Sequence, residues 1–281
     1  MRATQDGRSA VRVPLLDHGY IELIETWGSD QRIIESARMS TGKGFLGWGL
    51  LAVYICRRCN KEIPKEEVYE AEGGGSGHTG CWSIVDVNSK PGDEKLLRYL
   101  WENQHATPFE FGGMVVEVKA PIMVFREWHR HRSQGFNEAS ARYAPLPDEN
   151  YVPAVERCMA GGGHLTKQAT AASGAQALTE PDALAWLAEL ADVYEHAERV
   201  YQSGLRRGVP KELARLPVPV GRYSKMRATT NLRMWLAFAT LRTTAKNPAA
   251  QWEIRQYADA VGELLAEHFP RTYAVFAEGR K

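Results

Sequence analysis

The segment from residue 126 to residue 143 carries the densest set of side chains that could do chemistry. It reads REWHRHRSQGFNEASARY and contains Arg126, Arg130, Arg132, Arg142, His129, His131, Glu127 and Glu138. Guanidinium groups bind phosphate through paired hydrogen bonds and also donate to carbonyl oxygens, while carboxylates and hydroxyls orient sugars. The segment therefore predicts a site for an anionic ligand. The alternative interpretation is a basic helix end exposed to water.

A second group of residues has the spacing of metal ligands. Cys56-Arg-Arg-Cys59 and His78-Thr-Gly-Cys81 are separated by eighteen residues. Two such pairs suit a tetrahedral zinc site with three thiolates and one imidazole. Four protein ligands leave no position for a substrate, so we expect a structural ion that holds together a small segment with little core. The alternative is a set of unliganded thiols and a surface histidine.

Composition and charge exclude several classes of protein. The 281 residues are 44% hydrophobic and 25% charged, as in folded globular enzymes. A formal charge of +1 creates no overall field for DNA or an acidic membrane, so nucleic acid is not an expected partner. The longest apolar run, 45–55, is about half the ~20 residues of a membrane span. The chain start lacks an apolar signal-peptide core, so we expect a cytoplasmic protein with reduced thiols.

Apolar periodicity and capping residues predict the elements that position these groups. We expect short strands over 11–24 around a turn at 17–19, and a helix capped by Ser29 with Ile33 and Ile34 on one face. Other expected elements are a strand over 114–118 and helices over 93–104, 121–128, 181–205, after Pro210, over 231–242 and over 250–268. The residue composition changes over 43–91, and we interpret this segment as an insertion with its own fold.

The order of residues in the arginine-rich segment resembles a known family. Arg130-His131-Arg132, seven residues, Ser140 and then Arg142-Tyr143 are similar to the signature RHR-x7-S of the flavin-dependent thymidylate synthases (ThyX). His105-Ala-Thr-Pro-Phe-Glu110 resembles the family's H-x-T-P-F-E, and Ala214-Arg215-Leu216-Pro217 resembles a shortened A-R-x-x-L-P. Asn231 and Arg242 stand where the family has a flavin-contacting Asn and a pyrimidine-contacting Arg. The likeness covers roughly 11–40 and 92–278.

The resemblance implies a fold, a reaction and an assembly. The implied fold is α/β (α+β) and ThyX-like over 1–281, with a central mixed or antiparallel sheet, long flanking helices and a small zinc-knuckle-like insertion at 43–91. The implied reaction is 5-methylation of a uridine monophosphate with FAD as cofactor, methylenetetrahydrofolate as carbon donor and NADPH as reductant. Such an enzyme needs no cysteine nucleophile, so Cys158 is not expected to be catalytic. The family also implies a homotetramer with shared active sites.

The resemblance assigns roles residue by residue. The implied nucleotide ligands are Glu127, Arg130, Glu138, Ser140, Ala141, Arg142, Arg215 and Arg242. The implied FAD ligands are His105, Thr107, Arg130, His131, Arg132, Glu138, Asn231 and Arg233. Arg242 is the leading catalytic candidate because a fixed cation beside the uracil favours ionisation at N3. Taken alone, Thr107 could be a turn hydroxyl, Asn231 a helix N-cap and Arg215 a surface arginine.

Two positions depart from the family pattern. Glu127 replaces the usual Gln, and Ala237 replaces a second flavin-contacting Asn, whose loss could weaken FAD binding. A carboxylate near the sugar could accept hydrogen bonds from its hydroxyls, so UMP stays open beside dUMP as the substrate. Alternatively, Glu127 could pair with Arg126 or Arg130. Competing hypotheses are an inactive nucleotide-binding regulatory homologue and a zinc-dependent deaminase, although no H-x-E precedes a P-C-x-x-C in this sequence, as it does in the deaminases.

Overall fold

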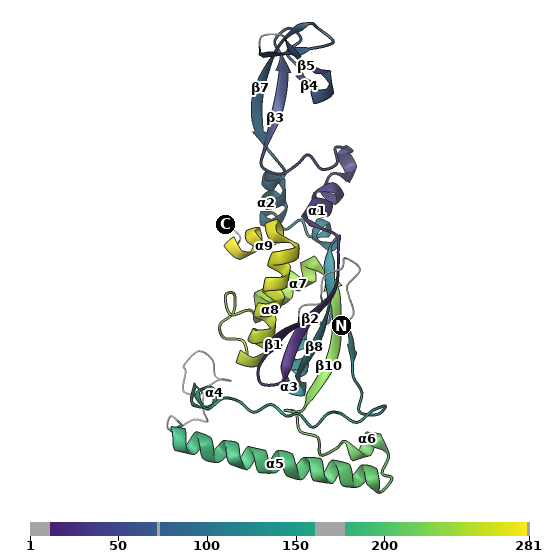
Figure 1. Cartoon of the computed structure of the whole chain (residues 1–281), viewed down its shortest axis with the longest axis vertical. Coiled ribbons are helices and arrows are strands. Elements are labelled where there is room, and N and C mark those ends of the chain that lie inside the picture. The colour runs from purple at the N-terminus through teal and green to yellow at the C-terminus, as the bar shows by residue number, and fades with distance from the viewer. Residues whose placement is uncertain (1–11, 72–73, 161–177, 280–281) are drawn as a thin grey trace. The chain divides into compact units, whose positions relative to one another are not determined.

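A computed structural model describes residues 12–71, 74–160 and 178–279 of the chain. Within these residues the chain forms two units. The larger unit contains the residues up to 27 and those from 112 to 273, and the smaller contains 28–111 and the residues from 274 onward. Each unit has a five-stranded sheet in which all neighbouring strands are antiparallel (Figure 1).

The sheet of the larger unit has the strand order β1-β2-β8-β10-β9. Its strands are β1 (Arg12–Leu15), β2 (Gly19–Trp27), β8 (Gly113–Pro121), β10 (Tyr223–Asn231) and β9 (Gly135–Glu138). In β8, Met114, Val116 and Val118 are fully buried, because alternate residues of a strand point to the same face. The predicted hairpin around residues 17–19, the strand at 114–118 and the central antiparallel sheet are confirmed.

Three helices pack together over this sheet and fix where the arginine-rich segment begins (Figure 1). They are α3 (Ile122–Trp128), α7 (Leu232–Arg242) and α8 (Trp252–His268), close to the predicted bounds. The ring of Trp128 stacks on that of Phe238 with their centroids 4.7 Å apart, and its edge meets Trp235 and Tyr257. All four rings are fully buried. This aromatic cluster holds the end of α3 against α7.

The longest helix, α5 (Glu180–Arg206), begins where Thr179 accepts a hydrogen bond from the backbone N–H of Asp182. Shorter helices α4 (Val155–Met159) and α6 (Lys211–Ala214) flank it in sequence. Apolar periodicity over 181–205 predicts one face that carries Leu184, Leu187, Leu190, Tyr194 and Tyr201. Tyr201 is buried but Leu184 is 51% exposed. The other buried residues of α5 are Ala183 and Ala197, and the buried Arg222, just before β10, lies 2.6 Å from the carboxylate of Glu198 on α5. A stripe of leucines in the sequence does not indicate these contacts.

The smaller unit combines helices with a separate sheet of strand order β4-β3-β7-β6-β5. Its elements are α1 (Asp30–Ala37), η1 (Met39–Thr41), β3 (Leu50–Cys56), β4 (Glu62–Ile63), η2 (Lys65–Glu67), β5 (Val68–Ala71), β6 (Gly75–His78), β7 (Ser83–Pro91), α2 (Glu94–Glu102) and η3 (Thr107–Glu110). The helix α9 (Pro270–Glu278), which we did not predict, runs from the larger unit into the smaller. Ser29 caps α1 as predicted, since its hydroxyl accepts from the N–H of Arg32 at 3.3 Å.

The sheet of the smaller unit has a small core. Cys56, Ile63 and Val85 are buried in it, and Cys59 and Cys81 pack against them. Strand β3 pairs with β7 along its whole length, from Leu50 opposite Pro91 to Cys56 opposite Val85, so the chain enters and leaves this sheet side by side. That arrangement suits an insertion, and the limits 43 and 91 stay a prediction.

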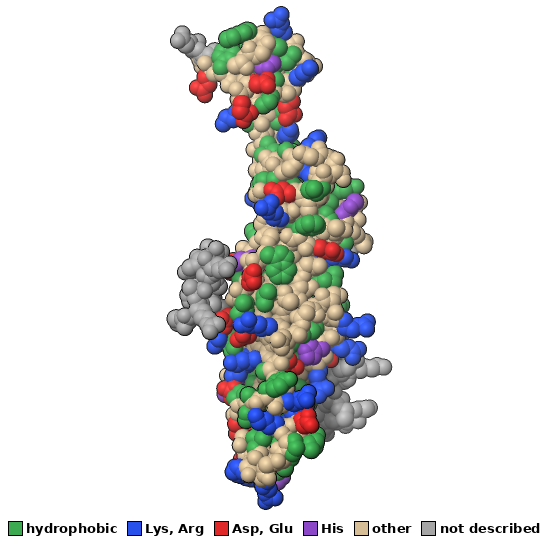
Figure 2. Space-filling view, turned by 90° about the vertical axis from the view of Figure 1, so that its right-hand side faces the viewer, with side chains coloured by type: hydrophobic (Ala, Val, Ile, Leu, Met, Phe, Trp, Pro, Cys, Tyr) green, Lys and Arg blue, Asp and Glu red, His purple; other side chains and the backbone are tan. Residues whose placement is uncertain are grey.

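Charges of both signs are mixed over the surface. On the face shown in Figure 2, Lys and Arg side chains are interspersed with Asp and Glu, in keeping with the formal charge of +1. Within residues 12–71, 74–160 and 178–279, no helix has both the length and the apolar composition that a membrane span requires.

Candidate active site

Arg242, the leading catalytic candidate, lies in the last turn of α7 and contacts the end of α3. Its Nε donates to Nε2 of His131 at 3.0 Å, and one terminal nitrogen donates to the carboxylate of Glu127 at 2.9 Å. The other terminal nitrogen donates to the backbone carbonyl of Glu127 at 3.4 Å. The side chain of Arg242 is 16% exposed and that of Glu127 is 43% exposed. Glu127 therefore pairs with Arg242 and not with Arg126 or Arg130, the alternatives suggested by proximity in sequence.

His131 must be neutral to accept this hydrogen bond. Burial, and then the charge of Arg242, lower its pKa from 6.5 to about 4, while Glu127 acts in the opposite direction. Because Nε2 accepts from Arg242, the ring proton is assigned to Nδ1. At neutral pH the guanidinium of Arg242 is thus held in one orientation by two acceptors, the uncharged ring of His131 and the carboxylate of Glu127.

We expect His131 to stay neutral at pH 5.5, where a histidine of ordinary pKa is mostly protonated. Since its pKa is about 4 in the folded chain and 6.5 as the reference value, the unfolded state binds more protons between these pH values. The folded state therefore loses stability as the pH falls from 6.5 toward 4. Imidazole nitrogen shifts measured by NMR, with His131→Gln used for assignment, check this expectation. A His131 midpoint near 6.5 would contradict it.

Arg130 and Arg132 lie between α3 and β9, and both side chains are exposed. Within the part of the chain that the structure describes, neither guanidinium forms an ion pair. Glu138, the last residue of β9, lies opposite Met226 on β10. The short edge strand thus places Glu138 at one border of the sheet, beyond the two arginines in sequence. These exposed cations can bind an anionic ligand without first losing a protein partner.

The turn after β9 carries three predicted nucleotide ligands. The N–H of Arg142 donates to the hydroxyl of Ser140 at 3.3 Å, and Ala141 between them is buried. The guanidinium of Arg142 lies 3.3 Å from the carboxylate of Glu212 in α6, and both side chains are more than half exposed. Such an exposed pair is weak and can be exchanged for a phosphate.

Two more basic residues, one in α6 and one directly after it, belong to the surroundings of this turn. Lys211, the first residue of α6, donates to the backbone carbonyl of Tyr143 at 2.9 Å. Arg215 follows α6 directly and its side chain is exposed. The fold therefore brings the two predicted phosphate ligands, Arg142 and Arg215, to one short helix. Sequence reasoning missed Lys211 and Glu212, although both lie within four residues of Arg215.

A cavity of about 340 Å³ opens beside Ser140. Its polar lining includes Lys119, Ser140, Tyr143, Tyr223, Ser224 and Lys225. The hydroxyl of Ser224 is buried and has no hydrogen-bond partner among the described residues, so it is available to a polar ligand atom. The volume falls in the range of about 300–1,000 Å³ that is typical of small-molecule sites. The cavity shares no residue with the contacts of Arg242, and no sequence motif pointed to Ser224.

The predicted FAD ligands fall in both units. Asn231 is indeed an N-cap, since its Oδ1 accepts from the N–H of Met234 at 3.0 Å, but its side-chain NH2 is left as a donor. Arg233, in the first turn of α7, and Ala237, one turn later, are both exposed. The helix start, with its positive dipole end and an arginine, matches an anionic diphosphate group in chemistry.

The two remaining FAD candidates belong to the smaller unit. Thr107 begins the turn η3 just before Pro108, and its side chain is exposed. The ring of His105 lies 5.6 Å from that of Tyr99, measured between centroids. Both residues therefore lie on a connection after α2 rather than inside a core.

The structure brings the four predicted metal ligands together. The ligand atoms of Cys56, Cys59, His78 and Cys81 all lie within 4.8 Å of one another. Hydrogen bonds, first from the backbone N–H of Cys59, lower the pKa of Cys56 to about 6. By contrast, burial raises the pKa of Cys158 in α4, which disfavours the thiolate form that a nucleophile needs.

Comparison with known proteins places the chain in a family. Residues 22–271 match the model of the family described as thymidylate synthase complementing protein. A flavin-dependent thymidylate synthase of Thermus thermophilus is 32% identical over 266 residues, which are 95% of this chain and 78% of that protein. The chain belongs to the flavin-dependent thymidylate synthase family. A second member, from Thermotoga neapolitana, is 29% identical and covers 95% of this chain and 94% of its own length.

A solved structure has the same fold as this member of the flavin-dependent thymidylate synthase family. The UMP/dUMP methylase PolB from Streptomyces cacaoi has a TM-score of 0.67 and 27% identity, over 95% of this chain and 97% of that one. That protein was solved with 5-Br dUMP and also with 5-Br UMP. The predicted family, the ThyX-like fold and the expectation of an enzyme are therefore confirmed, whereas the roles of individual site residues stay predictions.

Proposed function

We propose that this chain catalyses the FAD-dependent 5-methylation of a uridine monophosphate, dUMP or UMP. The observation that carries the proposal is the fixed guanidinium of Arg242, held by His131 and Glu127 in a chain of this family. Methylenetetrahydrofolate is the proposed carbon donor and NADPH the proposed reductant. When bound and reduced by NADPH, the flavin would supply the hydride that completes the methyl group.

Arg242 acts in this proposal through its charge. A cation beside the uracil lowers the pKa of N3–H, and the electron density released into the ring makes carbon 5 a better nucleophile. Because the guanidinium is already fixed by three hydrogen bonds, it need not reorganise as charge develops. Neutral His131 orients it without cancelling its charge.

The phosphate and sugar are assigned to the turn after β9. Arg142 and Arg215 would hold the phosphate, and Ser140 and Ala141 would hold the adjoining part of the nucleotide. The exposed pair of Arg142 with Glu212 and the cavity beside Ser140 support this assignment. Arg130 and Glu138 would complete the set of nucleotide contacts.

The proposed FAD ligands are Arg130, His131, Arg132, Glu138, Asn231 and Arg233, with His105 and Thr107 from the smaller unit. The donor set fits the cofactor, since exposed arginines and the α7 N-terminus suit its diphosphate and an amide suits its polar groups. The structural zinc predicted for the cysteine-histidine cluster takes no part in this reaction, because four protein ligands leave the ion no open position.

The proposed assembly is a homotetramer with shared active sites. Ser224, beside the cavity, and Asn231, at the start of α7, lie seven residues apart on β10. At a rise of about 3.3 Å per residue they are roughly 23 Å apart along the strand. This separation favours a site that combines the Ser140 end of one chain with the α7 end of another.

Parallel assays with dUMP and UMP test the proposed function. Protein supplied with FAD, NADPH and methylenetetrahydrofolate is expected to release a 5-methylated nucleotide. If the carboxylate of Glu127 recognises the ribose 2′-hydroxyl, Glu127→Gln should lower the UMP-to-dUMP ratio of kcat/KM by about tenfold, the value of one hydrogen bond. The Gln side chain can still accept from Arg242, so the dUMP rate is the internal control.

Two outcomes would change this assignment. A strong preference for dUMP that is equal in the wild type and in Glu127→Gln would rule out selection of UMP by the carboxylate. Protein that binds nucleotide but neither flavin nor the folate would favour the inactive regulatory homologue. That alternative is not favoured by the chain's relatives, which are named as synthases and a methylase.

A further inference from the structure

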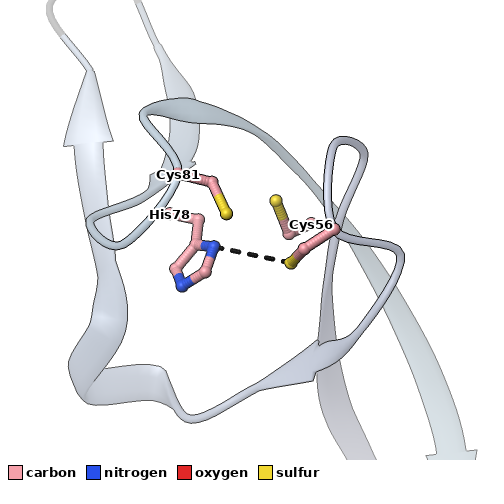
Figure 3. Close-up of side chains that lie close together, drawn as sticks. Cys56, His78 and Cys81 are labelled. Atoms are coloured by element: carbon pink, nitrogen blue, oxygen red, sulfur yellow. Dashed lines mark hydrogen bonds between the residues drawn. The ribbon is translucent and has the colours of Figure 1, made fainter.

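The four clustered ligands lie on two loops at the same end of the smaller sheet. Cys56 ends β3 and pairs with Val85 of β7, while His78 ends β6 and pairs with Ser83 of the same strand. Because β7 lies between β3 and β6, the loops that follow these two strand ends face each other. Figure 3 shows the side chains of Cys56, His78 and Cys81 turned toward one another.

Both loops are tight turns closed by backbone hydrogen bonds. The N–H of Asn60 donates to the carbonyl of Cys56 at 2.9 Å, and the N–H of Trp82 donates to the carbonyl of His78 at 2.7 Å. Each turn therefore presents both of its ligands to the same side.

We infer that Cys56, Cys59, Cys81 and Nδ1 of His78 bind one Zn²⁺ ion, and that Glu67 positions the imidazole through its other nitrogen. Nδ1 of His78 lies 3.8 Å from Sγ of Cys59, and Nε2 lies 3.0 Å from a carboxylate oxygen of Glu67. With Zn–S near 2.3 Å, ligand atoms in a tetrahedral site are roughly 3.8 Å apart. A carboxylate that accepts the Nε2 proton leaves the lone pair of Nδ1 for the metal.

The chemistry of the ligands selects zinc over the common hard cations. Thiolate and imidazole ligands suit Zn²⁺, whereas Mg²⁺ and Ca²⁺ prefer oxygen. Cys56 and His78 are buried, and the apolar core around them is small. The ion would therefore supply much of the cohesion of this sheet, independently of the methylation assigned to the larger unit.

Metal content of the full chain tests the site. Protein dialysed against a weak chelator should retain about one zinc per chain by mass spectrometry, and Cys81→Ser should retain less than about half of that. Cys158→Ser, the control, should retain the wild-type content. Cobalt-exchanged protein should show the visible absorption of a tetrahedral cobalt-thiolate centre. Zinc-free wild type, or a disulfide among Cys56, Cys59 and Cys81, would overturn the inference.

The role of Glu67 has its own measurement. Glu67→Gln should weaken zinc binding by about 10–100-fold in chelator competition, because the amide oxygen is a poorer acceptor for the imidazole N–H. The side chain of the neighbouring Glu66 is exposed, so Glu66→Gln should bind zinc as tightly as the wild type does. Equal affinities of the two variants would overturn the assignment to Glu67. Zinc content and chelator competition do not depend on turnover, so failure of the proposed methylation leaves this test intact.

Discussion

Arg242→Gln is expected to lower kcat/KM for 5-methylation by about 10²–10³-fold, the effect of removing one preorganised electrostatic group. The variant keeps a hydrogen-bonding side chain but loses the charge that favours ionisation of the uracil. The loss should appear with both dUMP and UMP, since they share the same base. Steady-state rates, measured together with flavin binding and Tm, separate a loss of chemistry from a loss of cofactor or fold.

Arg227→Gln is the matched control for Arg242. Arg227 also pairs with a glutamate, Glu117, but lies exposed on β10 and has no assigned role. The Arg227→Gln variant should keep kcat/KM within about twofold of the wild type, as expected for the loss of an exposed ion pair worth less than ~1 kcal/mol. A near-wild-type rate for Arg242→Gln would remove Arg242 from the reaction.

Mixing two inactive variants tests the sharing of sites between subunits. If Arg142 and Arg242 of different chains serve one nucleotide, then Arg142→Ala and Arg242→Gln chains, unfolded together and reassembled, should form some intact sites and regain activity. Reassembled mixtures of the right mass that stay inactive would argue against shared sites.

Arg222→Leu is expected to destabilise the fold by about 3–5 kcal/mol, the cost of breaking a buried ion pair from one side. The side chain of Arg222 is fully buried. It lies 2.6 Å from the carboxylate of Glu198 on α5 and 3.1 Å from that of Asp148, and it donates to the carbonyl of Pro147 at 2.8 Å. Loss of the Arg222 guanidinium would leave the carboxylate of Glu198 on α5 as an uncompensated charge.

Urea denaturation of the variant and of a control on the same helix measures this effect. Arg199→Leu removes an exposed pair with Glu195 one turn away on α5, and should cost less than about 1 kcal/mol. Equal losses in the two variants would show that the buried pair does not anchor α5. In the double variant Arg222→Leu with Glu198→Leu, stability should partly recover because no unpaired charge remains.

Local sequence signals determined the elements of this protein and the candidate residues. Ser29 and Asn231 are N-caps in the structure, because a side-chain oxygen beside a helix start satisfies a backbone N–H wherever the rest of the chain lies. The order of Arg130 to Ser140 indicated the family, and two short cysteine-histidine spacings indicated a metal site. Each of these signals depends on residues a few positions apart.

Only the tertiary structure decided which partners these residues have. Glu127 pairs with Arg242, 115 positions away, because the packed rings between α3 and α7 bring those helix ends together. Glu67 meets His78 through the pairing of β5 with β6, and Ser224 lies beside the same cavity as Ser140 because β10 is the neighbour of β9. Such contacts follow from strand order and helix packing, which depend on the free energy of the whole fold and leave no mark in a short stretch of sequence.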